Sequence, residues 1–157
     1  MRIRISPQPF DPLDELRCFE DALGERRRQI GAAATFVGTM RDFNEGAAVE
    51  SMVLEHYPGM TEKHLERIAG EAVERWGLDD ALVVHRVGEV RPGDAIVLVA
   101  VWSAHRAHAF ESCRFIMEDL KSSAPFWKQE RTRDGARWVA NNTPGSSDEF
   151  GTDASHR

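Results

Sequence analysis

Residues 96–101 limit the possible folds more than any other segment, because all six are apolar (Ile-Val-Leu-Val-Ala-Val). A run of this kind predicts a strand in the centre of a sheet. The preceding residues Arg91-Pro-Gly-Asp94 place proline and then glycine at the centre of a type II turn. Residues 81–90 and 95–102 are therefore predicted to form a hairpin.

Apolar residues at helical spacing predict three helices, residues 12–23, 61–76 and 104–121. Asp11 and Pro12 are typical of an N-cap and a first helical position, and Thr61 is expected to cap the second helix. The expected buried faces include Leu13 in the first helix and Phe110 in the third.

Further strands are predicted for residues 1–6 at a sheet edge, 30–37 as a buried strand, and 49–56. Residues 126–132 and 137–140 flank Asp134-Gly135, which predicts a second hairpin. Hairpins that alternate with helices favour an α+β fold with a mixed, mostly antiparallel sheet and three helices. We expect one domain, residues 1–140, and a disordered tail, residues 141–157, which is rich in Asn, Thr, Pro, Gly, Ser and Asp.

Composition excludes several functions. A net charge of -6 argues against general nucleic-acid binding, which needs a surplus of Lys and Arg. No apolar segment approaches the roughly 20 residues that span a bilayer, and the N-terminus has no apolar signal core, so we expect a cytoplasmic protein without membrane contact.

Cys18 and Cys113 lie far apart and in no CxxC pair, which excludes a disulfide scaffold and a zinc ribbon. Both cysteines are expected to be packing residues.

Basic residues stand beside two predicted strand ends. Gly38 would let the backbone approach a ligand closely, and Arg41 offers a planar fork for an oxyanion; the alternative is a solvated arginine. His105 and Arg106 stand where a strand meets a helix N-terminus, a place that favours anions. The alternative there is an ordinary strand–helix corner.

Two lysines follow in the same region. Lys121 would end the third helix, where the helix dipole already favours a cation. Lys128 lies next to Trp127, and on a strand it would face the same side as Glu130. A lysine among aromatic residues can lose its proton and act as a nucleophile or general base, although either lysine alone could be a solvated surface residue.

Arg106 and Lys121 would lie roughly 22 Å apart along one straight helix, at 1.5 Å per residue. One small-molecule pocket cannot hold both from the same chain. Either the two ends of the helix serve different functions, or the pocket lies between two subunits, which we favour as a hypothesis. His105, His108 and Glu111 do not converge on one side of the helix, so we expect no metal site.

Several of these segments resemble the MoaE family, the catalytic subunits of molybdopterin synthase. The resemblance covers about residues 3–139 and rests on the order and spacing of these motifs: Phe36-x-Gly38-x-x-Arg41, Leu54-Glu-His-Tyr-Pro-Gly-Met-Thr-Glu62, His85-Arg-Val-Gly-Glu89, Pro92-Gly-Asp94, Ser103-Ala-His-Arg106, Ala109-Phe110-Glu111 and Lys121-x-x-Ala-Pro-Phe-Trp-Lys128.

The resemblance implies an α/β-hammerhead fold, a homodimer with shared active sites, and a heterotetramer with a small ubiquitin-like sulfur carrier (MoaD-like). The carrier's C-terminal Gly-Gly thiocarboxylate would give sulfur to cyclic pyranopterin monophosphate (precursor Z) and form the dithiolene of molybdopterin, without a cofactor in this subunit. Lys121 and Lys128 would be catalytic. Lys121 would stabilise developing charge or accept the acyl group, and Lys128 would transfer protons or hold the phosphate. The substrate-binding residues would be Thr39, Met40, Arg41, His105, Arg106, Gln129 and Glu130.

Two other functions remain open. A module that only docks a ubiquitin-like protein would not need these basic residues at one pocket. A phosphate-ester hydrolase would usually need a metal or a nucleophile–base pair, and the sequence offers neither.

Overall fold

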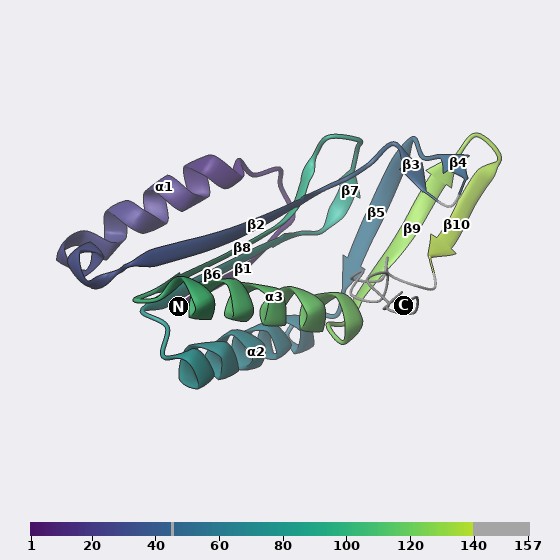
Figure 1. The fold of residues 1–157 in the computed structure, drawn as a ribbon. Helices are drawn as coiled ribbons and strands as arrows, with labels where there is room; N and C mark the ends of the chain where they lie inside the picture. Colours follow the sequence, from purple (N-terminus) through teal and green to yellow (C-terminus); the bar gives the residue numbers. More distant parts are fainter. Residues whose placement is uncertain (45, 140–157) are drawn as a thin grey trace, which may run out of the picture.

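The computed structural model describes residues 1–44 and 46–139 (Figure 1). The predicted tail, 141–157, lies outside the described residues. Along the chain the elements are β1 (Arg2–Ser6), α1 (Pro12–Leu23), the 3-10 helix η1 (Gly24–Gln29), β2 (Ala32–Thr39), β3 (Phe43–Asn44), β4 (Ala47–Ala48), β5 (Ser51–His56), α2 (Met60–Trp76), β6 (Asp80–Arg86), β7 (Gly88–Val90), β8 (Ala95–Ser103), α3 (Arg106–Ser122), β9 (Phe126–Thr132) and β10 (Gly135–Val139).

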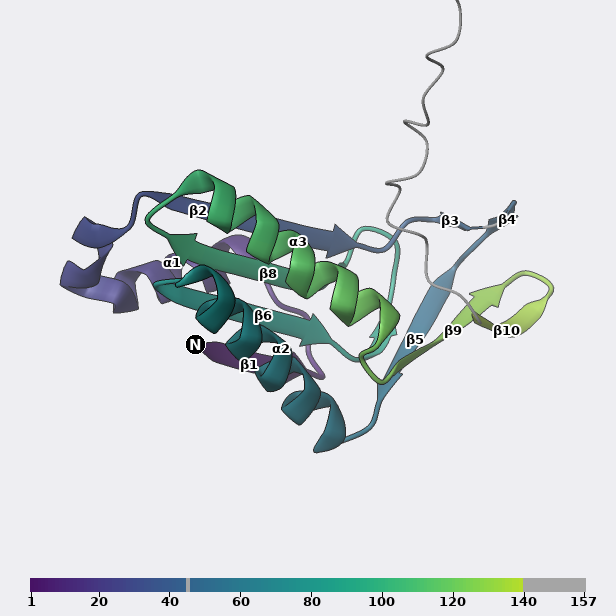
Figure 2. The ribbon, with the colours of Figure 1, turned by 60° about the horizontal axis from the view of Figure 1, so that its bottom comes forward.

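The strands form a sheet of order β1-β6-β8-β2, a second of order β10-β9-β5-β7, and the small pair β3-β4. Among the described strands only β1 and β6 pair in parallel. The predicted α+β class with three α-helices and mixed, mostly antiparallel sheets is therefore confirmed. Figure 2 shows α2 and α3 across one face of the first sheet, with α1 behind it.

The apolar run in β8 explains this layering. Successive side chains of a strand point to opposite faces. Val97, Val99 and Val101 pack with α2 and α3 in one core cluster. Leu98, Ala100 and Trp102 pack with α1 in another. The prediction of a central strand is thus confirmed.

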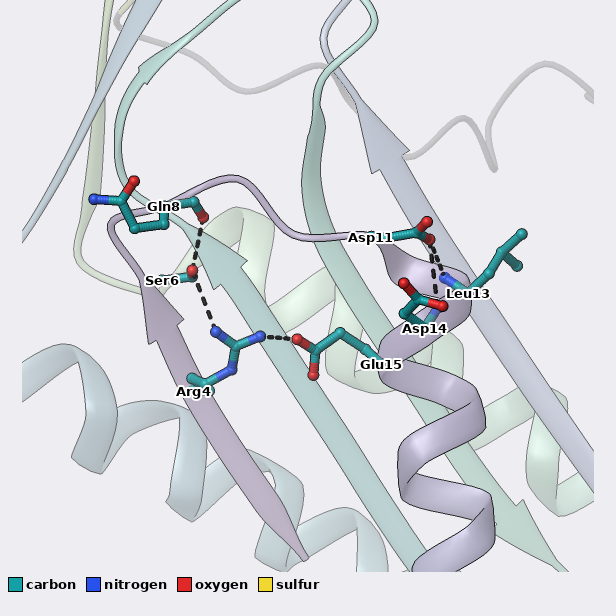
Figure 3. Close-up of polar contacts among 7 residues, drawn as sticks. All are labelled: Arg4, Ser6, Gln8, Asp11, Leu13, Asp14 and Glu15. Atoms are coloured by element: carbon teal, nitrogen blue, oxygen red, sulfur yellow. Dashed lines mark hydrogen bonds and ion pairs between the residues drawn. The ribbon is translucent and has the colours of Figure 1, made fainter.

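The start of α1 matches the predicted signals (Figure 3). Asp11 is the N-cap, and its side chain accepts hydrogen bonds from the backbone N–H groups of Leu13 (2.8 Å) and Asp14 (3.4 Å). Arg4 of β1 donates to Glu15 of α1, and this ion pair fixes the helix against the sheet edge.

The predicted strand 81–90 is divided in two. β6 pairs with β8 in the first sheet, as the hairpin prediction required, but β7 pairs with β5 in the second. Gly88, the first residue of β7, has a φ of 88°, a conformation that residues with a side chain disfavour. The chain therefore changes sheets at this glycine, and the site described below lies near this change.

The apolar run 30–37 does not form a buried strand. β2 is an edge strand, and Phe36 and Val37 are 41% and 39% exposed. Phe110 of α3 and Leu13 of α1, both predicted to be buried, are 70% and 73% exposed. Both residues lie near the start of their helices, and helical spacing alone does not decide whether a neighbouring element covers them.

Two further predictions are wrong. The N-cap of α2 is Gly59, not Thr61. Thr61 is buried instead, where it accepts from the Tyr57 N–H (3.0 Å) and donates to the Pro125 carbonyl (3.2 Å). Cys18 is exposed, whereas Cys113 is buried as expected. None of the helices in the described part of the chain has the length and apolar character to cross a membrane.

Candidate active site

A cleft of about 130 Å³ lies where the end of α3 meets the second sheet and the segment after β2. Its walls are formed by Thr39, Met40, Arg41, Phe43, Asn44, Val49, Met52, Ile96, Lys121, Lys128 and Glu130. We call this the polar cleft. An inner chamber of about 60 Å³ shares four of these residues, Met52, Ile96, Lys121 and Lys128, and adds Leu54, His85, Leu120, Ala124 and Phe126.

Six of the nine site residues predicted from the sequence meet in the polar cleft: Thr39, Met40, Arg41, Lys121, Lys128 and Glu130. The structure does not bring Gln129, His105 or Arg106 there. Gln129 points to the other face of β9, because it alternates with Lys128 and Glu130 along the strand.

The segment after β2 is held by backbone hydrogen bonds to the 91–94 turn. The Met40 N–H donates to the Asp94 carbonyl, and the Gly93 N–H donates to the Met40 carbonyl, both at 2.9 Å. Met40 is buried and Arg41 is exposed at the rim. These two hydrogen bonds fix the backbone next to Arg41 beside the cleft.

Gly38 lies where β2 and β8 pack closely together. A Cβ at this position would lie 2.8 Å from Cγ1 of Val97 on the neighbouring strand. The glycine therefore permits close packing between β2 and β8, and its close approach to a ligand stays a prediction. The register of these strands shifts just after it, between Gly38 and Thr39.

Lys121 lies in the last turn of α3, where helix carbonyl groups favour a cation. Burial, and then the positive charge of Lys128, hold the pKa of Lys121 below its ordinary value. The sequence contains only three lysines among its 20 basic residues, and two of them line this cleft. Lysine, unlike arginine, can give up its proton when buried, so this choice suits a reacting site.

Glu130 is 4% exposed, and its carboxylate is held by two neighbours. Arg137 of β10 donates to Oε2 at 3.1 Å, and Asn44 of β3 donates to Oε1 at 2.6 Å. A second Arg137 nitrogen reaches the Asn44 carbonyl at 3.1 Å. This network joins the β9–β10 hairpin to the β3–β4 pair and so supports the strand that carries Lys128.

Sequence reasoning missed Asn44, His85 and Arg137 as residues of the site and its support. Arg137 lies in the predicted hairpin, but a two-residue turn at Asp134-Gly135 would place it opposite Thr132. The structure turns at Arg133-Asp134 instead and pairs Arg137 with Glu130. His85 lies within a motif of the family resemblance but received no role. Asn44 had no signal, because the β3–β4 pair was not predicted.

His105 and Arg106 lie at the other end of α3, where His105 is the N-cap and both residues are exposed. The helix is continuous from Arg106 to Ser122 (Figure 2), so Arg106 and Lys121 are roughly 22 Å apart along it. The two basic groups of one chain therefore cannot contact one small molecule. Among the described residues, no three His, Cys, Asp or Glu side chains form a cluster that could hold a metal ion.

The fold and the cleft together define an α+β protein with two lysines in one cleft. Comparison with known proteins identifies the family. The family model described as "MoaE protein" matches residues 7–123. The chain therefore belongs to the MoaE family, the catalytic subunits of molybdopterin synthase.

Individual relatives agree. The molybdopterin synthase catalytic subunit of Ralstonia nicotianae is 58% identical over 137 residues, 87% of this chain and 76% of that protein. The structure of a molybdopterin biosynthesis MoaE protein from Burkholderia ambifaria has a TM-score of 0.73 and 51% identity, over 92% of this chain and 93% of that one. A Helicobacter pylori structure, described as a complex of subunits 1 and 2 of molybdopterin-converting factor, has a TM-score of 0.75 over 90% of this chain and 92% of that one. The two sequences are only 20% identical, so this match is evidence of a shared fold alone.

Proposed function

We propose that the polar cleft is the sulfur-transfer site of a molybdopterin synthase. The substrate is cyclic pyranopterin monophosphate, and the sulfur donor is the C-terminal thiocarboxylate of a small ubiquitin-like carrier. The observation that carries the proposal is the meeting of Lys121 and Lys128 in one cleft beside Arg41, in a protein that is acidic overall. Each thiocarboxylate supplies one sulfur, so two carriers serve for each dithiolene.

The chain's own residues support this chemistry. In each transfer the thiocarboxylate sulfur bonds to a side-chain carbon of the pterin and the oxygen at that carbon leaves, as water in one transfer and as an oxygen of the opened cyclic phosphate in the other. Water then cleaves the carrier's acyl–sulfur bond, which leaves sulfur on the pterin and a carboxylate on the carrier. Lys121, partly withdrawn from solvent, stabilises the negative charge that develops near the acyl group. Lys128 and Arg41 hold the phosphate. The thiol of Cys113 is a poor sulfur carrier, because it is buried and its pKa is raised to about 11 by burial.

A homodimer would complete the site. Phe36 and Val37 are exposed on the edge strand β2, and Phe110 is exposed on α3, which packs on that strand. Exposed apolar side chains of this kind favour an interface between subunits. A two-fold axis beside them would bring His105 and Arg106 of one chain toward the Lys121 cleft of the other, and would resolve their separation of roughly 22 Å.

The carrier is the second partner. The chain's relatives are named as catalytic subunits, and the Helicobacter pylori structure is a complex of two subunits. We place the enzyme in the cytoplasm. Two free cysteines support a reducing compartment.

The test is conversion of cyclic pyranopterin monophosphate by the purified protein. Thiocarboxylated carrier should give dithiolene product, and carrier with an ordinary C-terminal carboxylate should give none. Chelator-treated protein should work equally well, which separates this function from a metal-dependent hydrolase. Carrier that binds without any product would instead favour a docking module.

A further inference from the structure

His85 is a buried residue of the inner chamber that the proposed chemistry does not use. It stands near the end of β6 and is 3% exposed. Its side chain lines the same chamber as Lys121 and Lys128. A histidine in this position is a polar group on an otherwise mainly apolar wall.

The imidazole is held in one orientation by two contacts. Its ring stacks on that of Phe126, with 3.8 Å between ring centroids and 15° between planes. Its Nδ1 lies 2.8 Å from the Arg86 carbonyl oxygen. A carbonyl oxygen only accepts hydrogen bonds, so Nδ1 carries the proton and Nε2 of the neutral ring is left as an acceptor.

The surroundings keep this ring neutral. Burial is the main cause that lowers the pKa of His85 to about 3, and the Arg86 carbonyl opposes it. The positive charges of Lys121, His56 and Lys128 lower the pKa further. At neutral pH His85 is therefore a hydrogen-bond acceptor beside the two lysines and adds no positive charge to the chamber.

We propose that His85 is a positioning residue for sulfur transfer. Its backbone-anchored, neutral imidazole presents Nε2 as an acceptor to the lysine ammonium groups and orients them toward the polar cleft, without adding a third positive charge. This role rests on the proposed function. His85 acts through the lysines and touches neither substrate nor carrier.

Two substitutions separate this role from simple packing. His85→Gln places an amide oxygen near the position of Nε2 but lacks the donor to Arg86. His85→Asn keeps an amide N–H near Nδ1 but has no group near Nε2. Both variants lose the ring that stacks on Phe126, and Asn is one methylene shorter than Gln, so the thermal midpoint of each variant measures the remaining difference in packing.

The experiment measures kcat and KM for pterin conversion with thiocarboxylated carrier, together with the thermal midpoint of each variant. For His85→Gln we expect kcat within about threefold of wild type, and for His85→Asn a kcat at least about tenfold lower, with KM unchanged in both. Equal activity in the two variants, whether high or low, would overturn the proposal. So would activity losses that follow the loss in thermal midpoint. If wild type makes no product, the proposed function itself fails, which is a different result from failure of the variants alone.

Discussion

Lys121 in the last turn of α3 and Lys128 on β9 line the same cleft, and the charge of Lys128 helps to lower the pKa of Lys121. Two cations that line one cleft repel each other, and an anion bound between them relieves that repulsion. The phosphate and the thiocarboxylate of the proposed reaction are such anions. The placement of the two lysines in one cleft therefore fits the negative charge of the proposed substrates.

This coupling predicts a pH dependence. If Lys121 acts as a cation, the rate of sulfur transfer is constant below its lowered pKa and falls as pH rises through it. Lys128→Gln removes a positive charge, so the pKa of Lys121 rises and the alkaline limb moves to higher pH. The check is a single-turnover pH–rate profile. Lys63→Gln, at the third lysine, which is exposed on α2, is the control and leaves the limb in place. A limb that does not move in Lys128→Gln would contradict the coupling.

The shared site predicts complementation between two inactive variants. Arg106→Ala and Lys121→Ala proteins are each expected to lose activity. After subunits exchange, half of the dimers are mixed, and each mixed dimer has one intact site, so activity should return to about a quarter of wild type. The measurement is product formation before and after exchange. Activity that never recovers, with mixed dimers shown to form, would place the whole site within one chain.

The Glu130 network predicts a stability effect. Glu130→Ala leaves Arg137 and Asn44 without their buried acceptor and should lower the free energy of unfolding by about 1–3 kcal/mol. Arg133→Ala is the control, since Arg133 is 89% exposed and its ion pair with Glu50 spans 3.9 Å, so it should change stability by less than about 0.5 kcal/mol. Urea unfolding measures both. A Glu130→Ala protein as stable as the control would show that the network does not support the hairpin.

Gly38 predicts a compensating pair. Gly38→Ala places a methyl group against Val97 and should destabilise the protein by about 1–3 kcal/mol. Adding Val97→Ala creates room for that methyl group, so the double variant should be more stable than the sum of the two single effects predicts. Additive losses in a double-mutant cycle would mean that the two positions do not contact each other.

Much of the fold could be predicted from local sequence signals. The Asp11-Pro12 start of α1, the central strand β8 and the β9–β10 hairpin each depend on neighbouring residues, and each was predictable. The exposure of Phe36 and Phe110 was not, because exposure depends on tertiary packing, such as the edge position of the strand β2 that carries Phe36.

In the site, too, some features were predictable from local sequence and others depend on tertiary contacts. Alternation along a strand predicts that Lys128 and Glu130 share one face, and helix length predicts the distance between Arg106 and Lys121. His85 could not be assigned, because its neutral state results from burial beside residues distant in the sequence. Tertiary contacts, rather than any local pattern, decide the charge of such a group.

The most direct test of the central claim is single-turnover conversion of cyclic pyranopterin monophosphate by wild type and Lys121→Ala, with thiocarboxylated carrier in excess. Dithiolene product from wild type, with a rate in Lys121→Ala at least about a hundredfold lower and carrier binding retained, is the predicted result. Equal rates in the two proteins would contradict the account, because the chemistry would then not depend on the lysine around which the cleft is built.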